Sequence, residues 1–228
     1  MFLCFLDQAG IDMSATRLLL LKGIAVAAAV LVIGAASKPI VTISDLQFRR
    51  NPKSDAAHHW YDYVFTVTTD RELDTVDLSV VFYNGKGDFL GYDWLYGELP
   101  EGSIKLCGTA SVTGVATQVE VDIEIIEETT TPRNRPKVTT SGVQTTRNQT
   151  SDVNRYSYDY WFTAECSCKA QVEYSVLFYD AENTFLGCAL EQKDLKAGKH
   201  KLSGTAVIAG KPSIVEVVVT STYDISYR

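Results

Sequence analysis

The stretch VVFYNGKGDFLG, at Val80–Gly91, recurs as VLFYDAENTFLG, at Val176–Gly187, with half of its residues unchanged. The match continues on both sides, where YDYVFTV (61–67) corresponds to YDYWFTA (158–164) and GSIKLCGTASVTG (102–114) to GKHKLSGTAVIAG (198–210). A period of about 96 residues is too long for a solenoid, whose units have roughly 20–50 residues. The sequence therefore predicts two copies of one small domain.

Inside each copy, apolar and polar residues alternate. In TVDLSVVFY, at Thr75–Tyr83, every second residue from Val76 to Phe82 is apolar and those between are mostly polar. Such alternation is typical of antiparallel strands with one buried face, and the NGKG that follows is a hairpin signal. We expect strands near 40–48, 60–69, 75–83, 88–96, 103–113, 116–126, 137–145, 157–165, 171–179, 184–190, 200–208 and 213–223. Copies of this size suit a small β-sandwich.

Four segments follow from the repeat. We expect an N-terminal segment at 1–37, a first β-sandwich repeat at 38–127, a linker at 128–137 and a second repeat at 138–228. The linker lies in EETTTPRNRPK, whose Thr, Pro and charged residues do not build a core and whose prolines stiffen the chain.

The N-terminal segment contains RLLLLKGIAVAAAVLVIGAAS, at Arg17–Ser37, which predicts a transmembrane or signal helix at about 18–36. Nineteen helical residues rise about 28 Å, close to the roughly 30 Å hydrocarbon core of a bilayer. Arg17 and Lys22 precede the apolar centre, so we expect the N-terminus in the cytoplasm and the bulk of the chain outside.

Three interpretations of this helix compete. It is a retained membrane anchor, or a secretory signal that is cleaved near Ser37 after small residues. The third resembles an archaeal type-IV-pilin-like signal, because Lys22-Gly23 precedes Ile24-Ala25 and a long apolar run. We expect the anchor to be retained.

The strand VxFY(D/N), a short turn and FLG together resemble the FxLYD domain family. SVVFYNGKGDFLG and SVLFYDAENTFLG carry this resemblance, although the first copy has Asn84 where the family pattern prefers Asp. The family comprises immunoglobulin-like or fibronectin-like β-sandwiches of bacterial and archaeal envelope proteins. The resemblance implies two tandem antiparallel Ig-like β-sandwich domains and an envelope location, and it implies no catalytic residues.

Charge and spacing exclude several chemistries. A net charge of −7 disfavours nucleic acid, whose phosphates an acidic chain repels. The only histidines, His58, His59 and His200, have no zinc-type spacing, and no nucleophile elbow is visible. We expect no enzyme activity, no cofactor and no metal.

The cysteines are unequally shared between the copies. Cys166, Cys168 and Cys188 lie in the second copy and Cys107 is alone in the first. In an oxidising compartment Cys188 is expected to pair with Cys166 or Cys168; the alternative is buried reduced thiols.

Three aromatic residues of the first copy form a further candidate site. Tyr92, Trp94 and Tyr96 share one strand face and have no aromatic counterparts in the second copy, so we expect a binding patch for a protein or glycan. The alternative is that they cover the sandwich or pack on the other copy.

Asn148-Gln149-Thr150 is a glycosylation sequon.

These observations predict a non-enzymatic, membrane-anchored extracytoplasmic protein that presents tandem modules for protein or glycan binding at the cell envelope. The alternative is a pilin-like or envelope filament subunit, in which the apolar helix packs into a polymer core. Self-association into a homo-oligomer is left open by the sequence.

Overall fold

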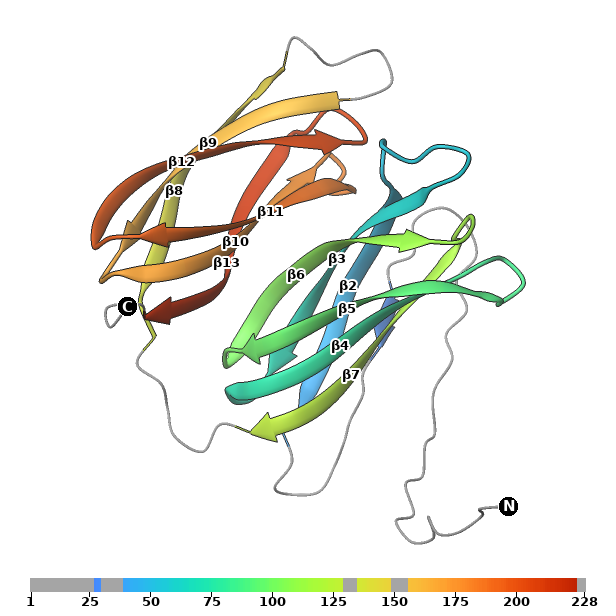
Figure 1. The fold of residues 1–228 in the computed structure, drawn as a ribbon, viewed down its shortest axis with the longest axis horizontal. Helices are drawn as coiled ribbons and strands as arrows, with labels where there is room; N and C mark the ends of the chain where they lie inside the picture. The colour runs from blue at the N-terminus through green and yellow to red at the C-terminus, as the bar shows by residue number, and fades with distance from the viewer. Residues whose placement is uncertain (1–26, 30–38, 129–134, 149–155, 225–228) are drawn as a thin grey trace, which may run out of the picture.

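The computed structural model describes residues 27–29, 39–128, 135–148 and 156–224. Their regular structure is entirely β, with thirteen strands and no helix among these residues (Figure 1). The strands are β1 (Ala27–Ala29), β2 (Val41–Arg50), β3 (His59–Thr69), β4 (Leu73–Tyr83), β5 (Phe89–Leu99), β6 (Gly102–Val112), β7 (Gln118–Glu128), β8 (Val138–Arg147), β9 (Tyr156–Cys166), β10 (Ala170–Tyr179), β11 (Phe185–Leu195), β12 (Gly198–Ile208) and β13 (Ile214–Asp224).

The strands form four small antiparallel sheets. Strands β2–β7, which we call unit 1, make the sheets β2-β3-β6, to which β1 adds a short edge strand, and β5-β4-β7. Strands β8–β13, which we call unit 2, make the sheets β8-β9-β12 and β11-β10-β13. In unit 1, buried side chains of both sheets, such as Tyr63 and Phe82, belong to one hydrophobic cluster, and Tyr160 and Phe178 do the same in unit 2. The fold is therefore all-β and β-sandwich-like, as predicted.

Strands β2–β13 occupy the places of the twelve predicted strands, with shifted ends. The largest shift is at β11, which continues to Leu195, because its pairing with β10 extends to Ala170↔Leu195. The segment EQKD near its end has no apolar alternation, so the sequence pattern stops before the strand does.

The repeat also appears in the backbone. Positive φ angles occur at matching places, namely Gly91 and Gly187, Gly102 and Gly198, Asp45 and Gly142, and Gly87 and Asn183. Strand β4 has 11 residues and β10 has 10, and the register of β4 shifts between Leu73 and Val76. Between YDYVFTV (61–67) and Val80 the first copy has one residue more than the second, and the irregular register at the start of β4 accommodates it.

Most of the predicted N-terminal helix lies outside the described residues. Ala27–Ala29 form strand β1, which pairs with β2 through Ala27↔Leu46 and Ala29↔Ile43. Among the described residues, no helix is long and apolar enough to cross a membrane. Residues 129–134 of the predicted linker also lie outside the description, while Arg135 pairs with Glu72 and Glu98 of unit 1.

Units 1 and 2 lie side by side and share a third hydrophobic cluster (Figure 1). It joins Val64 of β3 and Cys107 of β6 to Leu177, Tyr179 and Phe185 of unit 2. These contacts explain why β3 and β10 lose the alternation of buried and exposed residues that β9 and β4 keep. The middle of the outer face of β3 and the second half of the outer face of β10 are therefore buried between the two units.

Candidate functional site

An exposed row of aromatic side chains lies along β5, an edge strand of its sheet. Tyr92, Trp94 and Tyr96 are 61%, 57% and 65% exposed, and we call them the aromatic row. The rings of Trp94 and Tyr96 meet edge to face, with centroids 6.1 Å apart. The largest contiguous apolar patch on the surface of a monomeric protein is often functional.

The opposite side of β5 attaches the strand to the core. Asp93 Oδ2 accepts a hydrogen bond of 2.7 Å from the buried Tyr63 hydroxyl, and Leu95 packs against the core of unit 1. Burial and this hydrogen bond raise the pKa of Tyr63 far above its usual value. Because Asp93 and Leu95 attach β5 to the core, the aromatic row lies on a rigid strand.

The structure does not bury the aromatic row against unit 2. Its counterparts in β11 are Cys188, Leu190 and Gln192, so the row is particular to unit 1. Phe89 continues the row toward the hairpin, 59% exposed, with its ring centroid 6.5 Å from that of Tyr92. Sequence reasoning missed Phe89, because a phenylalanine occurs at this place in both copies and does not distinguish them.

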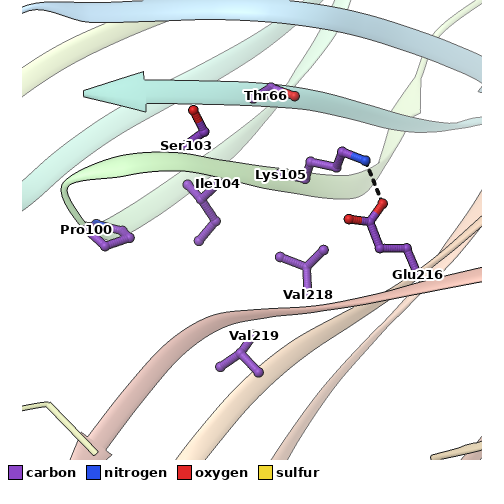
Figure 2. Close-up of a pocket in the computed structure, with 8 residues that line it drawn as sticks. All are labelled: Thr66, Pro100, Ser103, Ile104, Lys105, Glu216, Val218 and Val219. Atoms are coloured by element: carbon purple, nitrogen blue, oxygen red, sulfur yellow. Dashed lines mark hydrogen bonds and ion pairs between the residues drawn. The ribbon is translucent and has the colours of Figure 1, made fainter. Parts of the chain in front are cut away.

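A cleft of about 340 Å³ opens between β6 of unit 1 and β13 of unit 2 (Figure 2). Its wall includes Ile104 and Val218, and Lys105 Nζ lies 2.5 Å from Glu216 Oε2 across it. The same ammonium group lies 5.4 Å from the centre of the Tyr179 ring. The cation and the carboxylate of this cleft are thus already paired, and their evident role is to hold the two units together.

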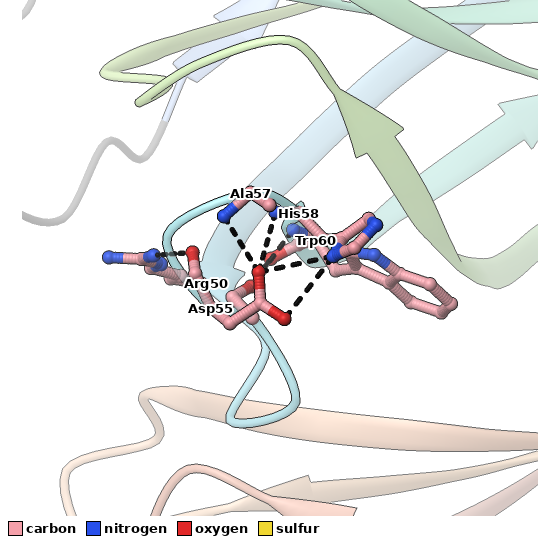
Figure 3. A network of polar contacts seen from close by, with 6 residues as sticks. Arg50, Asp55, Ala57, His58 and Trp60 are labelled. Carbon is pink, nitrogen blue, oxygen red and sulfur yellow. Dashed lines mark hydrogen bonds and ion pairs between the residues drawn. The ribbon is translucent and has the colours of Figure 1, made fainter.

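Two of the three histidines lie on or next to the loop between β2 and β3. Asp55 Oδ1 accepts hydrogen bonds from the backbone N–H groups of Ala57 and His58, and His58 Nδ1 lies 3.1 Å from it (Figure 3). The backbone hydrogen bond from Ala57, followed by the contacts with His58, lowers the pKa of Asp55. Arg50 Nη2 donates to the Asp55 carbonyl oxygen at 2.9 Å. Within the described ranges, no three metal-ligating side chains gather.

The cysteines are arranged differently from the predicted pairing. All four cysteines of the described part of the chain are free thiols, and Cys166 donates to the Cys168 carbonyl oxygen. Cys188 instead lies against Cys107 of unit 1. The structure therefore does not bring Cys188 to Cys166 or Cys168, because the outer side of β11 faces the other unit.

Asn148 has a structural role besides its place in the sequon. Its Nδ2 donates to the Asp159 carboxylate at 3.1 and 3.3 Å, and Thr205 donates to the same carboxylate at 2.7 Å. Unit 1 has the same arrangement, with Asn51, Asp62 and Thr109. Glycosylation of Asn148 stays a prediction; residues 149 and 150 lie outside the described residues.

Comparisons with known proteins give no family assignment. No protein-family model matches this chain, and no curated protein matches it. The FxLYD resemblance stays a prediction.

Proposed function

We propose that this chain is a non-enzymatic, membrane-anchored extracytoplasmic protein. Its two tandem Ig-like modules present the aromatic row of β5 to a protein or glycan partner at the cell envelope. The observation that carries the proposal is the exposure of Tyr92, Trp94 and Tyr96 on one strand.

Several features support this function. Tyrosine and tryptophan supply large apolar area with a polar tip and dominate binding energies at interfaces. The row lies on an edge strand that is fastened to the core through Asp93, so little ordering entropy is lost when a partner binds. The apolar run at 18–36 supports a membrane location, and the FxLYD resemblance supports the envelope.

The test is binding of the full-length chain, labelled and kept in detergent, to isolated cell envelopes. We expect Trp94→Ala to weaken binding about tenfold, a loss of about 1.4 kcal/mol. Leu190→Ala is the matched control, because Leu190 has the same place in unit 2 and is 53% exposed. Protease treatment of the envelopes removes a protein partner, and periodate oxidation removes a glycan.

Equal binding by the wild-type chain and by Trp94→Ala would rule out the aromatic row as the binding surface. An equal loss with Leu190→Ala would show a general effect of reduced surface apolarity, and it would also count against the proposal.

A further inference from the structure

The contact between the two units joins two unlike surfaces. Unit 1 contributes what we call the acceptor face, which consists of Gln47, Asp62, Val64, Lys105 and Cys107. Unit 2 contributes what we call the insert face, which consists of Leu177, Tyr179, Phe185, Gly187 and Glu216. Val64, Cys107, Leu177, Tyr179 and Phe185 form the apolar centre of this contact, and each is at most 3% exposed.

Two polar contacts and one close approach of the backbone surround this centre. Gln47 Oε1 accepts a hydrogen bond of 2.8 Å from the Phe185 N–H, which belongs to an edge strand. Lys105 pairs with Glu216. Gly187 passes so close to Asp62 that an added Cβ would lie 3.1 Å from Asp62 Oδ2.

Because the chain is a tandem repeat, each unit also carries the surface that the other one uses. The acceptor face of unit 2 consists of Gln144, Asp159, Trp161, Lys201 and Ser203. The insert face of unit 1 consists of Val81, Tyr83, Phe89, Gly91 and Glu120. The residue types of all three pairs recur on these second surfaces, as Gln144 and Phe89, Lys201 and Glu120, and Asp159 and Gly91.

These second surfaces are uncovered in the single chain. Phe185 is 1% exposed in the internal contact, whereas Phe89, at the same place in unit 1, is 59% exposed. Gln144, Lys201 and Glu120 are likewise exposed. Within the described residues, neither Lys201 nor Glu120 has an ion pair, although their counterparts Lys105 and Glu216 pair with each other.

We propose that a second copy of this chain occupies these surfaces, so that the insert face of unit 1 docks on the acceptor face of unit 2 of its neighbour. The contact would repeat the internal one, including its pairing of a lysine with a glutamate. It is heterologous, because the two surfaces differ, and each added copy leaves one surface of each kind uncovered. The product is a head-to-tail assembly.

The second pair of surfaces differs from the internal contact at a few residues. Trp161 replaces Val64 and Ser203 replaces Cys107 on the acceptor face, and Tyr92 replaces Cys188 beside the insert face. Trp161 Nε1 already donates to Gln144 Oε1 at 2.8 Å, but a carbonyl oxygen accepts a second hydrogen bond. Larger and more polar groups give a wetter contact, which suits an association that depends on concentration and salt.

The experiment is sedimentation velocity of the full-length chain in detergent over a range of concentrations and salt. The wild-type chain is expected to form a concentration-dependent series of species that weakens at high salt. Glu120→Lys and Lys201→Glu each place like charges at the new contact, so each should weaken association about tenfold. The double variant Glu120→Lys/Lys201→Glu restores opposite charges and should restore association. A mixture of the two single variants should associate as well.

Three results would overturn the inference. The wild-type chain stays a single species at every concentration, or the single variants associate as the wild type does, or the double variant fails to recover. If the single variants associate as the wild type does, association runs through other residues, such as 1–38, because Glu120 and Lys201 lie outside that segment.

The inference does not rest on the proposed binding function, and the two fail separately. Glu120 lies on β7 and Lys201 on β12, whereas the aromatic row lies on β5. Unchanged envelope binding by Trp94→Ala, with self-association that depends on Glu120 and Lys201, contradicts only the binding function. Loss of envelope binding by Trp94→Ala, with a wild-type chain that stays a single species, contradicts only the assembly.

Discussion

Cys107 of β6 and Cys188 of β11 meet in the hydrophobic cluster between the two units, where Cys188 Sγ lies 4.0 Å from the carbonyl oxygen of Gly108, the residue after Cys107. Their counterparts in the opposite copies are Ser203 and Tyr92. Each cysteine thus occurs only in the copy where it faces the other unit. The shared fold does not explain this pair, but the contact between the units does.

We predict that oxidation joins Cys107 to Cys188. Incubation with oxidised glutathione should form the bond by thiol–disulfide exchange, in which each cysteine loses a proton and the glutathione disulfide takes up the two electrons as two glutathione thiols. The neighbouring Cys107 thiol, together with burial, raises the pKa of Cys188, so little thiolate is present at neutral pH. The reaction should therefore be slow at neutral pH and faster at alkaline pH.

Peptide mapping under non-reducing conditions measures this outcome. A peptide pair containing residues 107 and 188, lost in Cys107→Ser, supports the prediction. A bond from Cys188 to Cys166 or Cys168 would show that the contact between the units opens in solution.

The two equivalent phenylalanines should differ in their effect on stability. Phe185→Ala removes a ring that is 1% exposed, and it should lower the free energy of unfolding by about 3 kcal/mol. Phe89→Ala is the matched control, with a ring 59% exposed, and its effect should stay within about 0.5 kcal/mol. Urea unfolding of both variants checks this, and equal losses would contradict the assigned contact.

Asp62 should make stability depend on pH. Burial raises its pKa, and this effect outweighs the opposing hydrogen bonds from Asn51 and Thr109. Because the folded-state pKa lies above the unfolded-state pKa, the protonated carboxyl favours the folded state. This stabilisation is complete at pH values below the unfolded-state pKa and is lost as the pH rises through the folded-state pKa.

Asp62→Asn cannot ionise and lacks this dependence. Urea unfolding from pH 3 to pH 7 should therefore give a free energy of unfolding for the wild-type chain that falls relative to that of the variant. The comparison cancels the other carboxylates, including Asp55 and Asp70, whose lowered pKa values act in the opposite direction. Parallel pH curves would mean that Asp62 is not buried by unit 2 in solution.

The mature protein should keep the apolar run at 18–36 and sediment with membranes. N-terminal sequencing combined with fractionation measures both properties. A start near Ser37 in the soluble fraction would identify a secreted protein and end the anchor proposal. A start at Ile24 would indicate processing of the type-IV-pilin kind and favour the filament subunit.

Much of the fold could be predicted, because it depends on local patterns in the sequence. The repeated VVFYNGKGDFLG motif specified two equivalent groups of strands, because the alternation of apolar and polar residues has the period of a strand. Turn residues at Asn84–Gly87 marked a hairpin for the same local reason. The exposure of Tyr92, Trp94 and Tyr96 could be suspected but not established, since an aromatic strand face suits a core equally well.

The sequence by itself determined that the chain is a β-sheet repeat, and the tertiary structure alone decided which faces of the two copies are covered. Phe89 and Phe185 are the same residue in the same motif, yet one is exposed and the other is buried. Local periodicity reports the face that each sheet turns to its own core, whereas the outer faces depend on how two folded units meet. That meeting joins residues as distant in sequence as Gln47 and Phe185.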